Sequence, residues 1–331
     1  MPTLYLLEQG AKLFKEQKKL VVEKDEKILL EIPEFKIDRV LLFGNIQITT
    51  QAMKFLLESG IETAFFNIHG KLIGRLSPVE SKNVLLRISQ YEAYRDENFR
   101  LKVAKAIVEG KIKNSKVMLQ RYQRNHPGEV DFSEPLRNLD SCLEELQNKT
   151  KVSTVVGLEG RASAVYFEAF GKMLRKDIQF TLRTRRPPQD PINSLLCLGY
   201  ALITSEMFSL VSAIGFDPYI GFLHGIDYGR PSLALDLIEE FRHAVVDRLT
   251  LELVNKEILT EDDFEEKEGG VYLKGESMKK FFVHYEKRML TLFQDECSGE
   301  ETNFRKTFLK QAQKFAKTIQ EGISYEPFLM K

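Results

Sequence analysis

The chain has 331 residues, of which 43% are hydrophobic and 29% charged; at roughly 100–200 residues per domain this length indicates about two domains, and the composition excludes a wholly disordered protein. Lysine plus arginine and aspartate plus glutamate number 48 each, which excludes a protein that is basic over its whole surface but allows a local basic face. The three cysteines, Cys142, Cys197 and Cys297, form no CxxC pair, which indicates reduced thiols in a cytoplasmic protein rather than a zinc ribbon or a disulfide framework.

The first 80 residues predict a β-rich domain. Five short runs rich in Leu, Val, Ile and Phe are separated by Gly, Lys, Asp and Pro, as strands usually are; they are TLYLLE, KLVVE, KILLEI, RVLLFG and ETAFFNI. Between Thr49 and Gly60 the period becomes helical, with a threonine that can cap the start and a glycine that can end the helix. His69-Gly70 predicts a hairpin turn before KLIGRL.

After Pro78 the pattern becomes helical. Apolar residues at approximately helical spacing predict a helix between Phe99 and Tyr122, and helices are expected from about Ser153 to the end. An exception is EEKEGGVYLKGE (265–276), which predicts a small hairpin. The predicted fold is therefore α+β: residues 1–80 form a β-rich domain with one helix, and residues 81–331 form a larger, mostly α-helical domain.

One segment, from Ser194 to Phe216, is long and apolar enough to span a membrane, with Glu206 as its one charge. It also contains several serine and threonine residues, and no second segment of this kind exists in the sequence. We therefore predict the buried central helix of a soluble domain and no membrane contact.

Basic residues are concentrated in a few helical stretches. Between Arg100 and Arg124 there are eight cations against one acid, Glu109. Each stretch could be a solvated helix face, but their recurrence in one helical domain favours a phosphate-binding surface. In this stretch, Lys111, Lys113 and Lys116 are the candidates for contact with phosphate.

An arginine-rich loop precedes the apolar segment. Arg183, Arg185 and Arg186 are followed by paired prolines, and Asp190 with Pro191 predicts the capped start of a helix. Guanidinium groups on a stiffened loop suit phosphate, so these three arginines are predicted to contact phosphate. Loop charges without a ligand remain the alternative.

Acids and one histidine in two further segments could carry chemistry. Glu159 lies near the start of VVGLEGRASAVYFEAFG, where an acid either complements the helix dipole or serves a site. His224 is flanked by glycines, and Asp236 and Glu239, three residues apart on the next predicted helix, share a face. Carboxylates bind Mg²⁺ or Mn²⁺, and an imidazole shifts the preference toward Mn²⁺. Such an ion would assist a phosphodiester reaction, although spacing alone does not bring these segments together.

Three segments, LEGRASAVYF (158–167), RTRRPPQDPINSLLCLGY (183–200) and GFLHGIDYGRPSLALDLIEEFR (221–242), resemble the CRISPR-associated integrase/endonuclease family, the first of the CRISPR adaptation proteins. The resemblance implies an N-terminal dimerisation domain and a helical catalytic domain. It also implies that Glu159, His224 and Glu239 ligate Mn²⁺ or Mg²⁺, with Asp236 as a supporting catalytic residue. Family members often have proline where this chain has His243, so His243 is not expected to be a ligand.

The implied reaction inserts new spacer DNA into a CRISPR array: the 3′-hydroxyl of a short prespacer attacks a phosphodiester of the CRISPR repeat. The implied partners are DNA, a second copy of the chain and the small second CRISPR adaptation protein. The DNA backbone would then be the phosphate ligand of Lys111, Lys113, Lys116, Arg183, Arg185 and Arg186, with the arginines nearer the metal. Two alternatives stay open. A general metal-dependent nuclease of DNA or RNA repair would need neither the repeat nor the small partner, and a non-catalytic DNA-binding scaffold would show no effect of metal on DNA.

Overall fold

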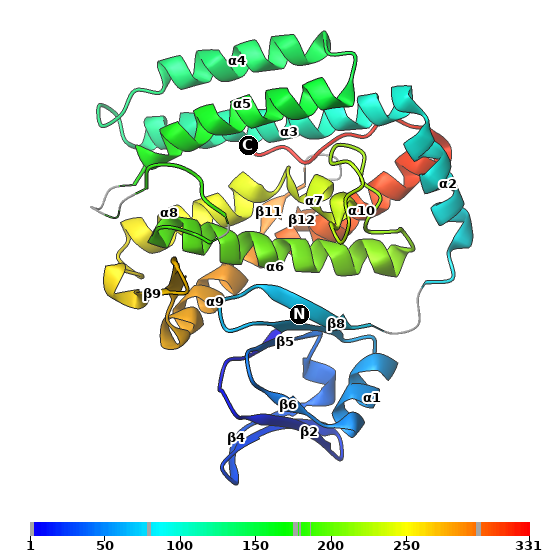
Figure 1. Ribbon diagram of the computed structural model, residues 1–331, viewed down its shortest axis with the longest axis vertical. Helices are drawn as coiled ribbons and strands as arrows, with labels where there is room; N and C mark the ends of the chain where they lie inside the picture. Colours follow the sequence, from blue (N-terminus) through cyan, green and yellow to red (C-terminus); the bar gives the residue numbers. More distant parts are fainter. Residues whose placement is uncertain (1–2, 78–80, 175–177, 179, 186, 296–298) are drawn as a thin grey trace. The chain divides into compact units, whose positions relative to one another are not determined.

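The computed structural model of the protein describes residues 3–77, 81–174, 178, 180–185, 187–295 and 299–331. The chain forms two compact units, Met1–Glu80 and Ser81–Lys331. The boundary coincides with the change from strands to long helices (Figure 1), which agrees with the predicted α+β fold.

Two four-stranded sheets make up the first unit (Figure 1). One has the order β1–β5–β7–β8, in which β1, β5 and β7 are parallel and β8 is antiparallel to β7. The other has the order β4–β3–β2–β6, with a parallel pair only between β2 and β6. The elements are β1 (Thr3–Leu6), β2 (Lys12–Glu16), β3 (Lys19–Lys24), β4 (Lys27–Pro33), the 3₁₀ turn η1 (Glu34–Lys36), β5 (Arg39–Phe43), β6 (Gln47–Ile48), α1 (Thr50–Glu58), β7 (Glu62–Phe66) and β8 (Leu72–Leu76).

The two sheets and α1 share one hydrophobic cluster. Leu6 and Leu42 come from the first sheet, Leu13 and Val22 from the second, and Leu56 from α1. Burying each such side chain stabilises the fold by about 1.5–3 kcal/mol. The buried side chains of both sheets and of α1 therefore form one core in this unit.

The predicted helix and hairpin of this unit are confirmed. The Thr49 hydroxyl accepts a backbone N–H of the first turn of α1, and Gly60 follows the helix with φ +65°. Between β7 and β8, the Asn67 side-chain oxygen accepts the N–H groups of His69 and Lys71 at 3.0 and 2.8 Å. The strand β2 was not predicted, because most of its residues (KLFKE) are charged.

Helices dominate the second unit, in which α3, α4 and α5 pack against one another and α6 packs against α7 and α10 (Figure 1). The predicted hairpin is confirmed as β9 and β10. The elements are α2 (Val84–Arg95), α3 (Glu97–Asn125), α4 (Ser133–Gln147), α5 (Val152–Gly171), α6 (Pro191–Ile214), α7 (Ser232–Ile238), the π-helical η2 (His243–Asp247), α8 (Arg248–Asn255), the 3₁₀ turn η3 (Glu261–Asp263), β9 (Phe264–Lys267), β10 (Gly270–Leu273), α9 (Gly275–Met289), β11 (Phe293–Gln294), β12 (Glu301–Thr302) and α10 (Phe304–Glu321).

Helix α6 is the predicted apolar segment, and it is a core helix. It is long and apolar enough to cross a membrane, but 67% of its most apolar window is buried inside the protein. Asp190 caps its start by accepting the N–H of Asn193 at 2.7 Å, Pro191 occupies the first position, and Gly215 ends it with φ +116°. The charge of Glu206 is matched by Arg305, whose Nε lies 3.2 Å from Oε1.

Candidate metal and catalytic site

Glu159 and Glu239 converge on the ammonium group of Lys111. Lys111 belongs to α3, Glu159 to α5, and Glu239 to the turn that follows α7. Lys111 Nζ forms an ion pair with Glu159 Oε1 and another, at 2.7 Å, with Glu239 Oε2. The side chains of Lys111 and Glu239 are 8% and 2% exposed, so the charges meet away from water, where an ammonium between two carboxylates offsets their repulsion.

Arg242 is a second cation that pairs with Glu239, at the carboxylate oxygen that Lys111 does not contact. We refer to the four residues of these ion pairs as the carboxylate cluster: Lys111, Glu159, Glu239 and Arg242. Arg242 Nη2 lies 2.8 Å from Glu239 Oε1. Burial alone would raise the pKa of Glu239, but Arg242, Lys111 and His224 together lower that pKa to about 2. Glu239 is therefore ionised at neutral pH.

The same balance holds for Glu159. Burial opposes ionisation of this carboxyl, and Glu239 repels it, yet Lys111 lowers its pKa below the usual value. The Ser163 hydroxyl, one turn further along α5, donates to Glu159 Oε1 at 2.8 Å and supports the charged form. Both glutamates are thus anionic oxygen donors placed side by side.

Asp236 organises the loop that carries His224. Its Oδ1 accepts the backbone N–H of His224 at 3.0 Å and lies 2.6 Å from His224 Nδ1. Its Oδ2 accepts the N–H groups of Phe222 and Leu223 at 2.6 and 2.9 Å. With Nδ1 engaged by a carboxylate, Nε2 is the imidazole nitrogen left to act as a ligand. Asp236 is therefore a positioning residue for His224.

Gly221 explains the glycine before this histidine. A Cβ at this position would lie 2.7 Å from the backbone of Ser232 and 2.8 Å from Asp236 Oδ2. Any side chain would push the loop away from the carboxylate that holds it, so the close approach requires glycine.

The backbone around Glu239 is not a regular α-helix. Glu239 N donates to Asp236 O at 3.2 Å and Phe241 N to Ile238 O at 2.9 Å, three residues back in each case. The π-helical η2 follows, and such irregular turns within helices frequently occur at functional sites.

A buried polar layer supports the carboxylate cluster from within the unit. The hydroxyls of Tyr166 (α5) and Tyr200 (α6) both donate to Asp247 of η2. Burial raises the pKa of Asp247 to about 6, against these hydrogen bonds. The guanidinium of Arg242 lies 4.7 Å from the Tyr200 ring centre, so α5, α6 and η2 are joined directly behind Glu239.

His243 has contacts of a different kind. Its ring Nε2 lies 2.9 Å from the Ser115 hydroxyl, and its ring packs edge-on against Tyr166 at 4.5 Å. Burial, followed by the charges of Lys111 and Arg242, lowers the pKa of His243 well below its usual value. This neutral, buried histidine is part of the core.

Two sequence-based expectations are corrected by these positions. Glu159 lies beyond the first turn of α5, which begins at Val152, so an interaction with the helix dipole does not explain it. Lys111 was predicted to meet DNA at the surface; it is buried in the carboxylate cluster, and the surface role is wrong. Lys113 is exposed and pairs with Glu109 at 2.6 Å.

Lys116 and the arginine loop have mixed environments. Lys116 pairs with Asp140. Arg183 donates to Asn193 Oδ1 at 2.7 Å, which ties the loop to α6. The pKa of Arg185 is lowered by partial desolvation and by the nearby cations Arg242 and Arg183. The negative charges of Glu239 and Glu159 act on that pKa in the opposite direction. Arg185 is thus within electrostatic reach of the cluster, and Arg186 lies outside the described residues.

The donor set fits a divalent cation. In the part of the chain that the structure describes, no three His, Cys, Asp or Glu side chains already surround one point; the Lys111 ammonium lies between the two glutamates. Apart from its ion pair with Lys111, the buried Glu239 Oε2 has no hydrogen-bond partner. Two ionised carboxylates and the free nitrogen of His224 are donors that Mn²⁺ and Mg²⁺ accept.

Sequence reasoning missed Lys111 and Arg242 as members of this site. Arg242 follows Glu239 by three residues on a helical path, and that spacing is a signal for an ion pair. Lys111 carries no such local signal, because seven other cations lie in the same stretch, 100–124.

Comparisons with known proteins match the whole chain. A family model described as "CRISPR associated protein Cas1" matches residues 4–287. The chain is 35% identical over 331 residues to "CRISPR-associated endonuclease Cas1 3" of Thermus thermophilus, covering 99% of this chain and 97% of that relative.

Solved structures show the same fold. A CAS1 protein from Thermotoga maritima matches with a TM-score of 0.83 and 27% identity over 100% of both chains. A Cas6-RT-Cas1–Cas2 complex matches with a TM-score of 0.85 and 25% identity over 100% of this chain and 36% of that chain. A casposase bound to an integration product matches in fold, with a TM-score of 0.88 and 24% identity over 99% and 93% of the two chains.

Proposed function

This chain belongs to the Cas1 family of CRISPR-associated endonucleases, and from that premise we propose that the carboxylate cluster is the centre at which prespacer DNA is joined to the CRISPR repeat. Cas1 proteins are the endonucleases and integrases of spacer acquisition. The observation that carries the proposal is the meeting of Glu159 and Glu239 at one cation position. His224, whose Nδ1 is held by Asp236, is near enough for its charge to lower the pKa of Glu239.

Glu159, Glu239 and His224 Nε2 would hold Mn²⁺ or Mg²⁺. The bound ion supplies positive charge for a phosphodiester oxygen and favours ionisation of the attacking hydroxyl. Asp236 fixes the imidazole through Nδ1, and Arg242 keeps Glu239 ionised. The position of the imidazole and the negative charge of Glu239 are therefore set by Asp236 and Arg242 before an ion binds.

The reaction is a transesterification. The 3′-oxygen of the prespacer forms a bond to phosphorus as one P–O bond of the repeat breaks, and the proton lost by the attacking hydroxyl is matched by one gained by the leaving oxygen. The number of phosphodiester bonds is unchanged, so the step needs no co-reactant. Water in place of the 3′-hydroxyl gives endonuclease cleavage.

DNA would contact this chain at the arginine loop beside the carboxylate cluster. In that loop Arg185 is exposed and Arg183 is partly buried. Arg186 belongs to the same proposal, and the exposed Lys113 and partly buried Lys116 extend it along α3. Such contacts go to phosphates and fix position without reading sequence. A cytoplasmic site of action follows from a DNA substrate.

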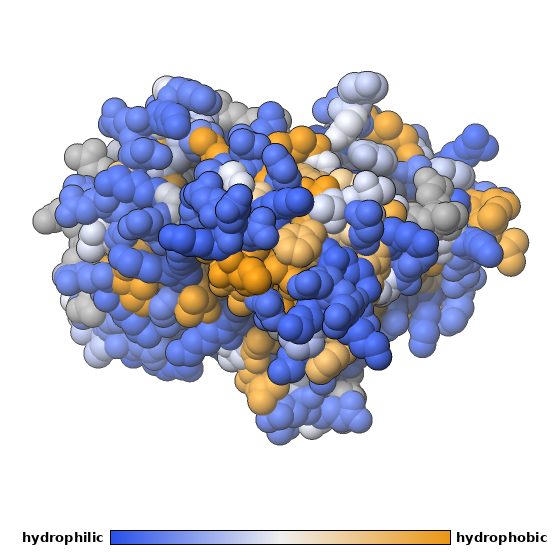
Figure 2. All heavy atoms as spheres, turned by 90° about the horizontal axis from the view of Figure 1, so that it is seen from below, coloured by the Kyte–Doolittle hydropathy of each residue, from blue (hydrophilic) through white to orange (hydrophobic). Residues whose placement is uncertain are grey.

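Two protein partners complete the proposal: a second copy of this chain and the small second CRISPR adaptation protein, since one structural neighbour is a complex that contains Cas1 and Cas2. For the homodimer, β4 is the edge strand of its sheet and leaves Ile28, Leu29 and Leu30 at least 42% exposed. Phe35, just after β4, is 81% exposed. An exposed apolar edge strand suits pairing with another chain. Figure 2 shows one face of the molecule, on which hydrophobic residues gather in groups among hydrophilic ones.

A strand-transfer assay tests the function. Labelled prespacer DNA is incubated with the chain, the small adaptation protein, Mn²⁺ and a plasmid with or without the repeat. We expect joined product that requires the repeat, the metal and the 3′-hydroxyl. Metal-dependent cleavage without any joining would indicate a general nuclease, and DNA binding that metal does not affect would indicate a scaffold.

A further inference from the structure

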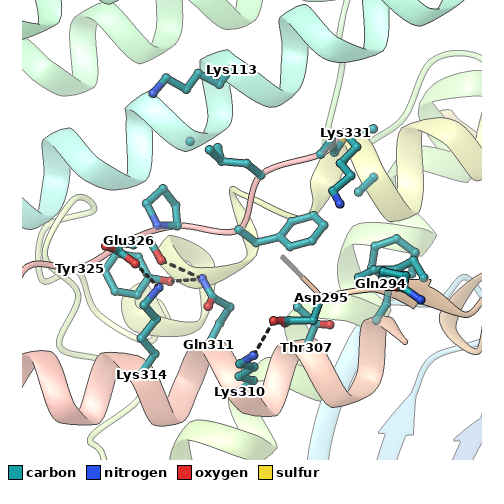
Figure 3. A pocket seen from close by; sticks show the side chains of 18 of the residues that line it. Lys113, Gln294, Asp295, Thr307, Lys310, Gln311, Lys314, Tyr325, Glu326 and Lys331 are labelled. Atoms are coloured by element: carbon teal, nitrogen blue, oxygen red, sulfur yellow. Dashed lines mark hydrogen bonds and ion pairs between the residues drawn. The ribbon is translucent and has the colours of Figure 1, made fainter. Parts of the chain in front are cut away.

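A large cavity in the second unit lies apart from the carboxylate cluster. Its volume is about 1120 Å³, and α3, α8, α9, α10 and the segment 325–331 contribute to its wall. Figure 3 shows this wall, with Lys310 and Lys314 of α10 on one side and Lys113 of α3 on the other. None of the three proposed metal ligands lines it.

The acidic side chains of the cavity wall are already matched by lysines. Glu109 pairs with Lys113 at 2.6 Å. Asp295 pairs with Lys310 at 2.8 Å and Glu326 with Lys314 at 2.8 Å, the two ion pairs drawn in Figure 3. Among the described residues that line the cavity, these are the only acidic side chains, so this part of the wall offers no further aspartate or glutamate to its remaining cations.

Three arginines on the wall are left unmatched. Arg121 comes from α3, Arg248 from the start of α8 and Arg288 from the end of α9. Among the described residues, none of the three forms an ion pair. Burial, followed by repulsion from Arg248, lowers the pKa of Arg288 to about 9, with Glu252 acting in the opposite direction. Burial and the charge of Arg248 also lower the pKa of Arg121.

Arg288 is fixed in position by the protein. Its Nε donates to Ala244 O at 2.8 Å and its Nη2 donates to the same oxygen. The guanidinium also lies 4.9 Å from the centre of the Phe304 ring. Because this geometry is set by the protein, little side-chain freedom would be lost on binding an anion.

We propose that Arg121, Arg248 and Arg288 form a binding site for a phosphomonoester. A terminal phosphate carries about −1.5 to −2 charge and three acceptor oxygens at neutral pH, which matches three guanidiniums on the wall of one cavity better than a carboxylate or a phosphodiester with one charge. Arginine forks also bind phosphate with paired hydrogen bonds. The ligand is either the 5′-phosphorylated end of a nucleic-acid strand or a free nucleoside monophosphate, both of which the cavity volume admits.

The test uses the full chain in excess chelator, so that it does not depend on metal chemistry at the carboxylate cluster. Affinities are measured for a single-stranded oligonucleotide with a 5′-phosphate, the same oligonucleotide with a 5′-hydroxyl, and adenosine 5′-monophosphate. We expect the 5′-phosphate to strengthen oligonucleotide binding by roughly tenfold, about 1.4 kcal/mol. A mononucleotide that binds as tightly as the phosphorylated strand would identify the free nucleotide as the ligand.

The variant Arg121→Gln/Arg248→Gln removes two of the three charges without touching the Arg288 contacts to Ala244. It should abolish the difference between the two oligonucleotides and the binding of the mononucleotide, whereas Lys102→Gln, an exposed cation on the same helix that does not line the cavity, should keep both. Equal affinity of the wild-type chain for the two oligonucleotides, together with no binding of the mononucleotide, overturns the proposal without reference to any variant. A double variant that retains the wild-type preference also overturns it.

Discussion

Lys111 Nζ lies 2.7 Å from Glu239 Oε2, and both side chains are buried. The same ammonium pairs with Glu159, so one lysine stands between two carboxylates that we propose as metal ligands. A divalent cation and Lys111 therefore compete for the same oxygens. Under the proposed function, Lys111 keeps the acids together until a metal binds, and the metal would have to displace it from between them.

Lys111→Met should separate the stabilisation of the two glutamates by Lys111 from its competition with a metal ion. In chelator the variant leaves two like charges buried side by side, so it should lose about 3–5 kcal/mol of unfolding free energy. Its affinity for Mn²⁺ should rise, because no ammonium has to be displaced, and Mn²⁺ should restore most of the lost stability. Denaturant unfolding in chelator and in Mn²⁺, together with calorimetric titration of Mn²⁺, measures both quantities.

The matched control is Lys113→Met, which removes an exposed i,i+4 pair on the same helix. It should change stability by less than about 1 kcal/mol and leave Mn²⁺ affinity as in the wild type. Weaker Mn²⁺ binding by Lys111→Met would show that the lysine does not compete with the ion.

Asp236→Asn should impair metal binding through His224. The carboxylate meets four donors, three of them backbone N–H groups and one the imidazole, and an amide offers only one acceptor oxygen. A loss of about 10–100-fold in Mn²⁺ affinity is expected, measured by titration alongside the cleavage rate. Asp227→Asn, an exposed acid in the same loop, should behave as the wild type. Unchanged Mn²⁺ affinity in Asp236→Asn would contradict the positioning role.

Asp247 should make stability depend on pH. Its pKa is raised to about 6 in the folded chain, above the value of about 3.9 expected when unfolded. The folded chain therefore holds a proton more tightly, and this contribution is fully present below about pH 4 and is lost as pH rises through about 6. Across this pH range the contribution of Asp247 to the unfolding free energy changes by on the order of 2–3 kcal/mol.

Asp247→Asn should remove that component, so that the wild type minus variant difference in unfolding free energy falls between about pH 4 and 6 and is flat above about pH 7. Urea unfolding at several pH values measures it. A difference that stays constant across this window would mean that Asp247 is ionised in the fold throughout.

The proposed dimer should depend on the exposed face of β4. Leu29→Lys combined with Phe35→Lys places charges on side chains that are 50% and 81% exposed, so it should leave the fold intact and shift the chain from dimer to monomer. Light scattering after size exclusion measures the mass, and circular dichroism checks the fold. Ile73→Lys on β8, also exposed, is the control; a dimer that persists in the double variant would exclude this edge.

Local sequence patterns predicted much of the fold and only part of the site. The turn around Gly70, the cap at Asp190 and the core helix α6 follow from side chains close in sequence. Glu159 and Glu239 belong to segments that only tertiary packing brings together, and the resemblance to a family identified them before any geometry did. Lys111 could not be separated from its basic neighbours, because its burial depends on the packing of α3 against α5.

The most direct test of the central claim is a crystal of the chain soaked in Mn²⁺ and measured at a wavelength where manganese scatters anomalously. We predict one anomalous peak within coordination distance of Glu159, Glu239 and His224 Nε2, with the Lys111 ammonium moved out from between the two glutamates. A fully soaked crystal with no peak at these residues, and with Lys111 still paired to both carboxylates, would contradict the assignment of this cluster as the metal site.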